Sequence, residues 1–313
     1  MTNHIKKLTL LAAAAVLTAA IPGTLQAGGK IEIDYKRSDF DNPTIIDNPL
    51  WPLTPGMTAT YAAEGEECEV NTTYVAAPNN PSDPIAPFNV KSIEGLPGAS
   101  LPVIVVYDVA WIDEECDGNL VLEEFTFDWH AQDNAGRAWY LGEETYDCED
   151  GECEMGDGAW EAGVDGAIPG IIMLANPRSG DQYDQEFLED FAEDKGKALR
   201  TDTWVSLYRD DALVPADFHH CLKTKEWTPL EHGHVEHKFY CPGVGLVAVD
   251  ELKGRTVRFE RVSPVVQPHG RPPSRPSKLF GLGMEDLWRS RPQGTKAIVT
   301  APADVSVHTA GEP

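Results

Sequence analysis

Hydrophobic and polar residues alternate in the middle of the chain, where residues 120–142 predict one long β-hairpin. In its first arm, Phe125, Phe127, Trp129 and Ala131 are each followed by a polar residue. A period of two residues is the signature of a strand with one buried face. Residues 133–136 then supply turn chemistry, and the chain returns through a second arm.

The register of this hairpin predicts the centre of the core. If Asp133 pairs with Arg137, odd-numbered residues of one arm face odd-numbered residues of the other. One apolar face then carries five side chains, namely Phe127, Trp129, Ala131, Trp139 and Leu141. We expect the remaining strands to cover this face and to leave the acidic residues to water.

Further strand patterns follow one another at short intervals. They are residues 57–61, 103–112, 203–208, 221–227 with 235–240, and 245–250 with 256–261. Many short strands separated by turns predict an all-β fold, either an antiparallel β-sandwich or a partly open curved barrel with at most one or two short helices. Residues 185–199 fit a helix and a strand equally well.

The two ends of the chain differ from its middle. Lys6 and Lys7 precede an apolar run from Leu8 to Ile21, the pattern of a secretory signal peptide over residues 1–27. The alternative, a transmembrane anchor, needs ~20 apolar residues, and no later stretch is long enough either. Residues 263–313 are rich in proline and predict a largely flexible tail whose apolar residues 279–288 either dock elsewhere or pack back on the body. Residues 28–262 form the predicted β-rich domain.

Net charge narrows the classes of partner. The chain carries a formal charge of −26, and residues 28–262 hold 17 basic against 47 acidic residues. Such a surface repels phosphate backbones and anionic membranes, so we expect no nucleic-acid partner. The lack of a later apolar run of sufficient length predicts no membrane span. It suits cations, basic partners or a saline habitat.

Six cysteines in an exported chain predict three disulfides. Cys148 and Cys153 flank a tight Asp-Gly turn, and Cys221 and Cys241 are symmetric about a second hairpin. Cys68 and Cys116 remain and would join an early strand to a turn. The alternative, a redox pair at Cys148 and Cys153, lacks the C-x-x-C spacing. The expected location is the periplasm or the extracellular space.

Three segments resemble a family of exported bacterial β-rich proteins with the pattern V-P-x-G-x-F…C-L-K…Y-x-P-G-V-G-L-V. They are Val214-Pro215-Ala216-Asp217-Phe218, Cys221-Leu222-Lys223 and Tyr240-Cys241-Pro242-Gly243-Val244-Gly245-Leu246-Val247. The resemblance spans residues 51–249 and implies export and a curved antiparallel sheet. That family is functionally uncharacterised, so no catalytic residue is carried over. The chain departs from the pattern at His130, where a tyrosine is expected, and at Ala216-Asp217, which lacks the usual glycine.

An acidic loop gives a first metal candidate. Asp113, Glu115, Asp117 and Glu124 follow the spacing of a calcium-binding loop, with Gly118 at its sixth position. The flanking segments are strand-like, whereas the motif needs helices, so an acidic hairpin turn is the favoured interpretation. Residues 113–157 hold 16 acids and one base, Arg137, which makes weak cation binding there reasonable.

Histidines give a second metal candidate. His232 and His234 would share one strand face with Glu236, a set suited to copper or zinc. His237 falls on the opposite face, and His219 and His220 lie at the far end of the hairpin. A surface turn is therefore the favoured interpretation, although His130 could also contribute a ligand.

Catalysis has little support in the sequence, which has no G-x-S-x-G, H-E-x-x-H or P-loop motif. Acid pairs could serve a carbohydrate-active enzyme, but they arise easily in so acidic a chain. We predict an exported, non-catalytic binding or structural β-domain with an unknown ligand or protein partner. The main alternative is a protein that binds a divalent cation, either calcium or copper/zinc.

Overall fold

The computed structural model describes residues 28–262, except 65–66, 79, 150–151, 157, 209–213 and 254. The predicted signal peptide and the predicted tail lie outside these residues. One 3-10 turn, η1 (Arg37–Asp39), precedes the strands. The first half of the sheet contains β1 (Thr58–Glu64), β2 (Cys68–Val75), β3 (Lys91–Ile93), β4 (Leu101–Asp113), β5 (Val121–Gln132), β6 (Ala138–Glu149), β7 (Glu152–Met155), β8 (Trp160–Glu161) and β9 (Gly170–Met173). The second half contains β10 (Gln182–Asp184), β11 (Lys195–Ser206), β12 (Asp217–Trp227), β13 (Glu236–Cys241), β14 (Gly245–Lys253) and β15 (Arg255–Arg261).

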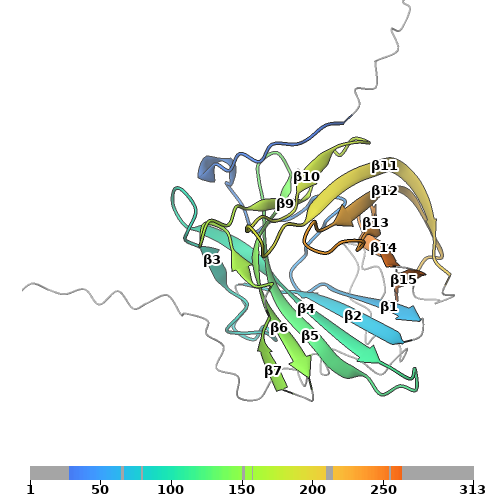
Figure 1. Ribbon diagram of the computed structural model, residues 1–313. Coiled ribbons are helices and arrows are strands. Elements are labelled where there is room, and N and C mark those ends of the chain that lie inside the picture. The colour runs from blue at the N-terminus through green and yellow to red at the C-terminus, as the bar shows by residue number, and fades with distance from the viewer. Residues whose placement is uncertain are drawn as a thin grey trace, which may run out of the picture.

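These strands form one strongly curved antiparallel sheet (Figure 1). The hydrogen-bonded order is β10-β11-β12-β13-β14-β15-β1-β2-β4-β5-β6-β7, so the first strand pairs with the last in the middle of the sheet. The two ends approach where Ile168 N donates to Phe187 O (2.8 Å), but no continuous ladder joins them among the described residues. The all-β prediction is confirmed, and the open curved arrangement, rather than the two-sheet sandwich, is the one observed.

The predicted central hairpin is confirmed as β5 and β6. Asp133 N donates to Arg137 O (3.1 Å), and Ala131 faces Trp139 across the ladder. All five predicted apolar side chains, Phe127, Trp129, Ala131, Trp139 and Leu141, are buried in one cluster. They lie on the outer face of the sheet, where residues 31–40, 85–101 and 160–167 cover them.

One β-bulge changes the far part of this hairpin. His130 pairs with Tyr140, but Asp128 pairs with Glu143, so β6 holds one residue more than β5 between these two pairs. A bulge turns the following side chains to the other face of the sheet. Tyr140 and Glu143 therefore face the same side, although they are three residues apart.

Residues 46–57 form the floor between the two halves of the sheet. Ile46, Leu53 and Trp51 pack in a second cluster with Val106 of β4 and Tyr240 of β13. Gly243 N donates to Pro49 O (2.7 Å), which ties this segment to the second half.

The helical alternative for residues 185–199 is wrong. Their first part contains turns and two isolated bridges, and their second part belongs to β11. Lys195 to Ala198 pair with β12, and the apolar residues before them lie in a turn that the Leu188–Ala192 bridge closes.

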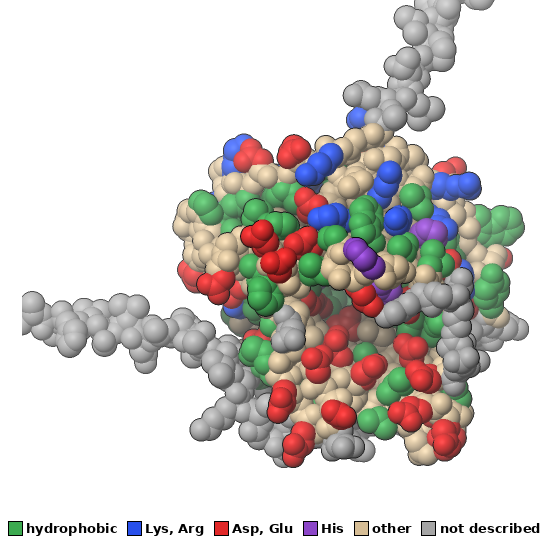
Figure 2. All heavy atoms as spheres, viewed as in Figure 1, with side chains coloured by type: hydrophobic (Ala, Val, Ile, Leu, Met, Phe, Trp, Pro, Cys, Tyr) green, Lys and Arg blue, Asp and Glu red, His purple; other side chains and the backbone are tan. Residues whose placement is uncertain are grey.

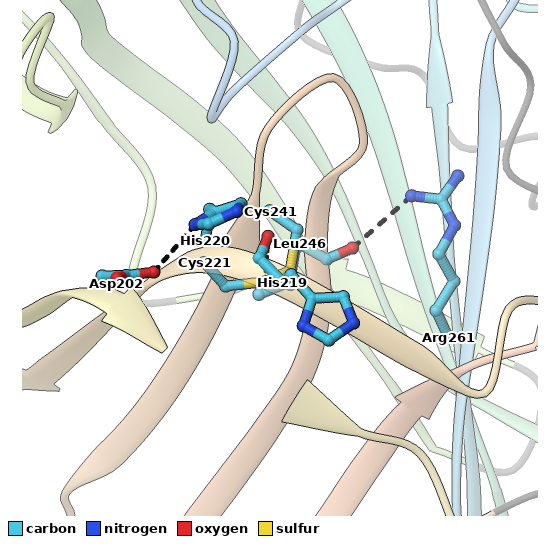
Figure 3. The surroundings of a disulfide bond; sticks show 7 residues. All are labelled: Asp202, His219, His220, Cys221, Cys241, Leu246 and Arg261. Atoms are coloured by element: carbon cyan, nitrogen blue, oxygen red, sulfur yellow. Dashed lines mark hydrogen bonds and ion pairs between the residues drawn. A yellow bond between two sulfur atoms is a disulfide. The ribbon is translucent and has the colours of Figure 1, made fainter. Parts of the chain in front are cut away.

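Three disulfides join Cys68 to Cys116, Cys148 to Cys153, and Cys221 to Cys241, which are the pairs that the spacing predicts. The third fastens β12 to β13, and Figure 3 shows it between His219 and Leu246. Three disulfides are typical of proteins in an oxidising compartment.

Asp133 organises the turn between β5 and β6. Its buried carboxylate accepts hydrogen bonds from Arg137 N (2.9 Å), Arg137 Nε (2.6 Å) and Trp139 Nε1 (3.0 Å). We predict that Asp133→Ala lowers the free energy of unfolding by ~3 kcal/mol, because it leaves buried donors without an acceptor. Chemical denaturation measures this change. The matched control is Asp117→Ala in an exposed turn, which should cost less than ~1 kcal/mol; equal losses in both variants would contradict the assignment.

Candidate functional site

A cavity of about 410 Å³ lies between the two halves of the sheet, above the floor segment. Figure 2 shows this side of the molecule hollowed, with acidic side chains in and around the hollow. Eight carboxyl groups line it, those of Asp108, Asp128, Glu143, Glu186, Asp194, Glu226, Glu236 and Glu251. The expectation that the acids are left to water is therefore wrong for this face. Because the sheet curves around on itself, its polar face turns inward.

A tyrosine bridges two of these carboxyls. Tyr140 Oη lies 2.7 Å from Asp128 Oδ1 and 2.8 Å from Glu143 Oε2. A phenol has one proton to donate, so both contacts are hydrogen bonds only when one carboxyl is protonated and donates to the phenol oxygen. Burial and the charge of Glu143 raise the pKa of Asp128, and burial raises the pKa of Glu143 to about 7. The geometry and the pKa shifts both favour a shared proton.

Two further acids sit near this pair. Burial raises the pKa of Asp108 on β4 to about 7. Glu186 accepts a hydrogen bond from Trp160 Nε1 (2.8 Å), and burial together with the charges of Asp194 and Glu143 raises its pKa to about 9. At neutral pH these side chains hold protons that exposed carboxyls would have lost.

On the opposite wall of the cavity, a lysine pairs with two glutamates. Lys238 Nζ lies 3.2 Å from Glu226 Oε2 and 2.9 Å from Glu236 Oε2. Glu226 also accepts from Tyr240 Oη (2.9 Å) and Thr224 Oγ1 (2.7 Å). Burial alone would raise the pKa of Glu226, but Lys238 and these donors hold it below its usual value. This wall has its own counter-ion, whereas no basic side chain among the described residues forms a salt bridge with Asp128 or Glu143.

Aromatic rings cover part of the cavity surface. His130 stacks on Tyr140 with 5.0 Å between ring centroids, and Trp51 meets His130 and Tyr240 edge-on at 5.8 Å each. Burial lowers the pKa of His130 to about 4, so the ring is neutral. His130 is 3% exposed, and its Nδ1 has no hydrogen-bond partner among the described residues.

The structure does not bring the predicted calcium ligands together. The loop connects two strands, β4 and β5, and Asp113 uses its carboxylate to accept from Asp117 N (3.2 Å) and Gly118 N (2.7 Å). Glu115 is exposed on the loop. Glu124 lies further along β5 opposite Asp147, and burial and that neighbour raise its pKa. This part of the chain has the geometry of the acidic turn.

The structure brings part of the predicted histidine site together, with Glu251 in the place of His232. Ligand atoms of His234, Glu236 and Glu251 all lie within 4.8 Å of one another. His232 is exposed and outside this group, and the sequence reasoning missed Glu251 on β14. Glu236 pairs with Glu251 across β13 and β14, a register that only the long-range pairing reveals. His130 lies in the cavity wall, and His220 is at the other end of the hairpin beside Asp202 (Figure 3).

The bulge explains why Glu143 was missed. In the regular register Glu143 would lie on the apolar face, but the extra residue in β6 turns it into the cavity. Gly142 adopts φ +134°, and a Cβ there would lie 2.3 Å from Trp160 O. An isolated glycine in a strand pattern is the sequence signal for such a bulge.

Comparisons with known proteins give little further direction. No family model matches the chain, and no curated protein does either. One similar solved structure is a candidate exported protein with a YmcC-like fold from Bacteroides fragilis, with 13% identity, a TM-score of 0.27, and coverage of 68% of this chain and 97% of that one. Another is a candidate lipoprotein from Parabacteroides distasonis, with 11% identity, a TM-score of 0.23, and coverage of 69% and 98%. Similarities this low assign neither a family nor a function.

A search for membrane-crossing elements gives one negative finding. Within the described part of the chain, no helix has the length and apolar character needed to cross a bilayer.

The buried carboxyls predict an unusual pH dependence of stability. A carboxyl whose pKa is raised by folding stabilises the protein at low pH and loses that contribution as pH rises through its folded pKa. His130 is neutral in both folded and unfolded chains above pH ~6.5, so the carboxyls dominate above that value. We predict that the free energy of unfolding falls between pH ~6.5 and ~9.5, by up to ~1.4 kcal/mol per pH unit for each titrating group.

Denaturation at a series of pH values tests this prediction. Glu186→Gln should flatten the profile above pH ~8, since the pKa of Glu186 is raised to about 9. Glu152→Gln, an exposed substitution on β7, should leave the slope unchanged. A flat wild-type profile would contradict the prediction.

Proposed function

We propose that the chain is an exported binding domain, located in the periplasm or outside the cell, that holds a small ligand in the cavity of the curved sheet. One observation supports it above the rest: the cavity of about 410 Å³ combines an aromatic surface with the carboxyls of Asp108, Asp128 and Glu143, which form no salt bridge with a basic side chain of the described residues. Its size falls within the usual range for small-molecule sites, about 300–1,000 Å³. Unpaired buried carboxyls cost stability, and a ligand that satisfies them offsets that cost.

Binding without catalysis is the simpler proposal. The cavity supplies acceptors, donors and ring faces, which is what recognition requires. The sequence carries none of the nucleophile, metalloprotease or phosphate-loop motifs that would add a bond-breaking step.

A cavity-filling variant tests the proposal. We predict that a library of cationic, neutral and anionic metabolites contains a compound that raises the melting temperature of the wild type. Thr73→Trp, which places an indole in the cavity, should abolish that shift, while Thr201→Trp on the exposed side of β11 should keep it. At 100 times the dissociation constant, the ligand adds ~2.7 kcal/mol to the free energy of unfolding. A shift that survives in Thr73→Trp would place the ligand elsewhere.

Divalent-cation binding is a second candidate, supported by the His234, Glu236 and Glu251 group. One imidazole and two carboxylates suit zinc or copper better than calcium. Two of the three, Glu236 and Glu251, also line the cavity. Two ion pairs compete with metal binding at this site, because Glu236 pairs with Lys238 (2.9 Å) and His234 pairs with Glu231 (3.4 Å).

The two neighbouring histidines provide a matched test of this candidate. We predict that the purified chain binds one zinc or copper ion, and that His234→Ala weakens the affinity at least ~10-fold because a ligand is lost. His232→Ala should leave the affinity unchanged, since His232 lies outside the group. Metal titration with elemental analysis measures both. Equal loss in the two variants would point to a surface chelate instead.

A further inference from the structure

We propose that the ligand of the cavity is a small organic cation, a primary amine with a short apolar body, whose ammonium group is held by Asp108, Asp128 and Glu143. This inference rests on the proposed function and names the chemical class of the ligand.

The charge balance of the cavity is the first argument. Among the described residues, its walls carry eight carboxyls and two strongly basic side chains, Lys238 and Arg261. Lys238 is already shared between Glu226 and Glu236, and Arg261 donates to Val244 O (3.2 Å) and Leu246 O (3.5 Å), the latter drawn in Figure 3. Within the described residues, no basic side chain forms a salt bridge with Asp108, Asp128 or Glu143. A positive charge is therefore the missing component of this wall.

The register places these three acids as neighbours. Asp128 lies directly opposite Glu143 across β5 and β6. Asp108 pairs with Thr126 across β4 and β5, which makes Asp108 and Asp128 diagonal neighbours on the same face. Three acceptors from three adjacent strands match the three N–H donors of a primary ammonium. A quaternary ammonium has no donors to offer them.

The rest of the wall argues for an organic body rather than a bare ion. Met57, Ile172 and Trp51 give the cavity an apolar surface, and the edges and faces of Tyr140 and Tyr240 lie beside it. A metal ion would leave this surface covered only by water, whereas a carbon chain removes it from water. Ring faces near an ammonium also attract it.

His130 lines the cavity and carries a second polar atom that a ligand could satisfy if the ring shifts. Its buried Nδ1 has no partner among the described residues, which is costly unless a ligand provides one. A hydroxyl or a second amine at the far end of the ligand would hydrogen-bond to this neutral ring. A diamine or an amino alcohol therefore fits better than a simple alkylamine.

Binding of such a cation should release protons. An ammonium favours ionised carboxyls, so the proton shared through Tyr140 leaves when the amine enters. The raised pKa values of Asp128 and Glu143 mean that a proton is present to be released. The titratable groups that act on this pair are Asp108, Glu124, Tyr140, Glu186 and Asp194, and Lys238 acts on Asp108 from the opposite wall. The groups that act on Asp128 and Glu143 themselves are all acidic, so they strengthen the attraction for a cation.

Calorimetry on the full exported chain tests the inference with matched probes. The probes are 1,4-diaminobutane and 4-amino-1-butanol, their neutral counterpart 1,4-butanediol, and calcium. We expect the two amines to bind at least 10-fold more tightly than the diol. The measured heat should differ between phosphate and Tris buffers at equal pH, because the buffer takes up the released proton and the two buffers have different protonation enthalpies. Glu143→Gln should weaken amine binding at least 10-fold, while the exposed Glu149→Gln should not.

The outcomes separate this inference from the proposed function. Glu143→Gln replaces a carboxyl, whose pKa burial raises to about 7, with a neutral group of the same shape, so an unchanged melting temperature shows that the variant is folded. A diol that binds as tightly as the diamine, or calcium that displaces the amines, would overturn the inference. Suppose that neutral compounds bind, that amines do not bind, and that Thr73→Trp abolishes the binding of the neutral compounds. The cavity then still binds a ligand, and only the proposed chemical class of the ligand is wrong. Amine binding that survives Thr73→Trp, or no binding by any compound, would overturn both.

Discussion

The structure depends on one constraint, which is that the middle parts of strands β4, β5 and β6 are covered on both faces. On the outer face this is ordinary hydrophobic packing around Trp139. On the inner face, curvature brings carboxyls from separate strands into one partly enclosed space where water screens them less than at the surface. Each must then be neutralised by a cation, a proton or a hydrogen bond. The cavity uses all three solutions.

The two walls of the cavity show how differently the same residue type can behave. Glu226 contacts Lys238 and Tyr240, and its carboxylate stays ionised although the side chain is buried. Glu143 faces Asp128 through a tyrosine, and it keeps its proton to about pH 7. The difference comes from one lysine on β13, which has no counterpart on β4, β5 or β6 near the pair. The two walls of the cavity therefore differ in charge balance. Lys238 pairs with the acids of one wall, whereas no basic side chain among the described residues pairs with Asp128 or Glu143 on the other.

Local sequence patterns were enough to predict the strands, but not what surrounds the inner face of the sheet. The period-2 alternation identified the β5–β6 hairpin and its apolar face, and the spacing around short turns identified the cysteine pairs. Alternation alone cannot tell whether the polar face meets water or another part of the sheet, because that depends on curvature and on pairings between distant strands. Glu143 required knowledge of the bulge at Gly142. Glu251 required the register of β13 with β14, which the sequence of either strand does not specify.

The pairing of β1 with β15 has a consequence for how this protein assembles. Tyr61 lies opposite Arg261, so the seam that joins the two halves unites residues separated by almost the whole domain. Contacts of such long sequence separation are entropically costly to form and slow to appear during folding. The cavity therefore forms only after β15 has paired with β1. Until then the two acidic walls belong to separate, incomplete sheets with unpaired edges, the form in which the chain is most exposed to proteases and to aggregation.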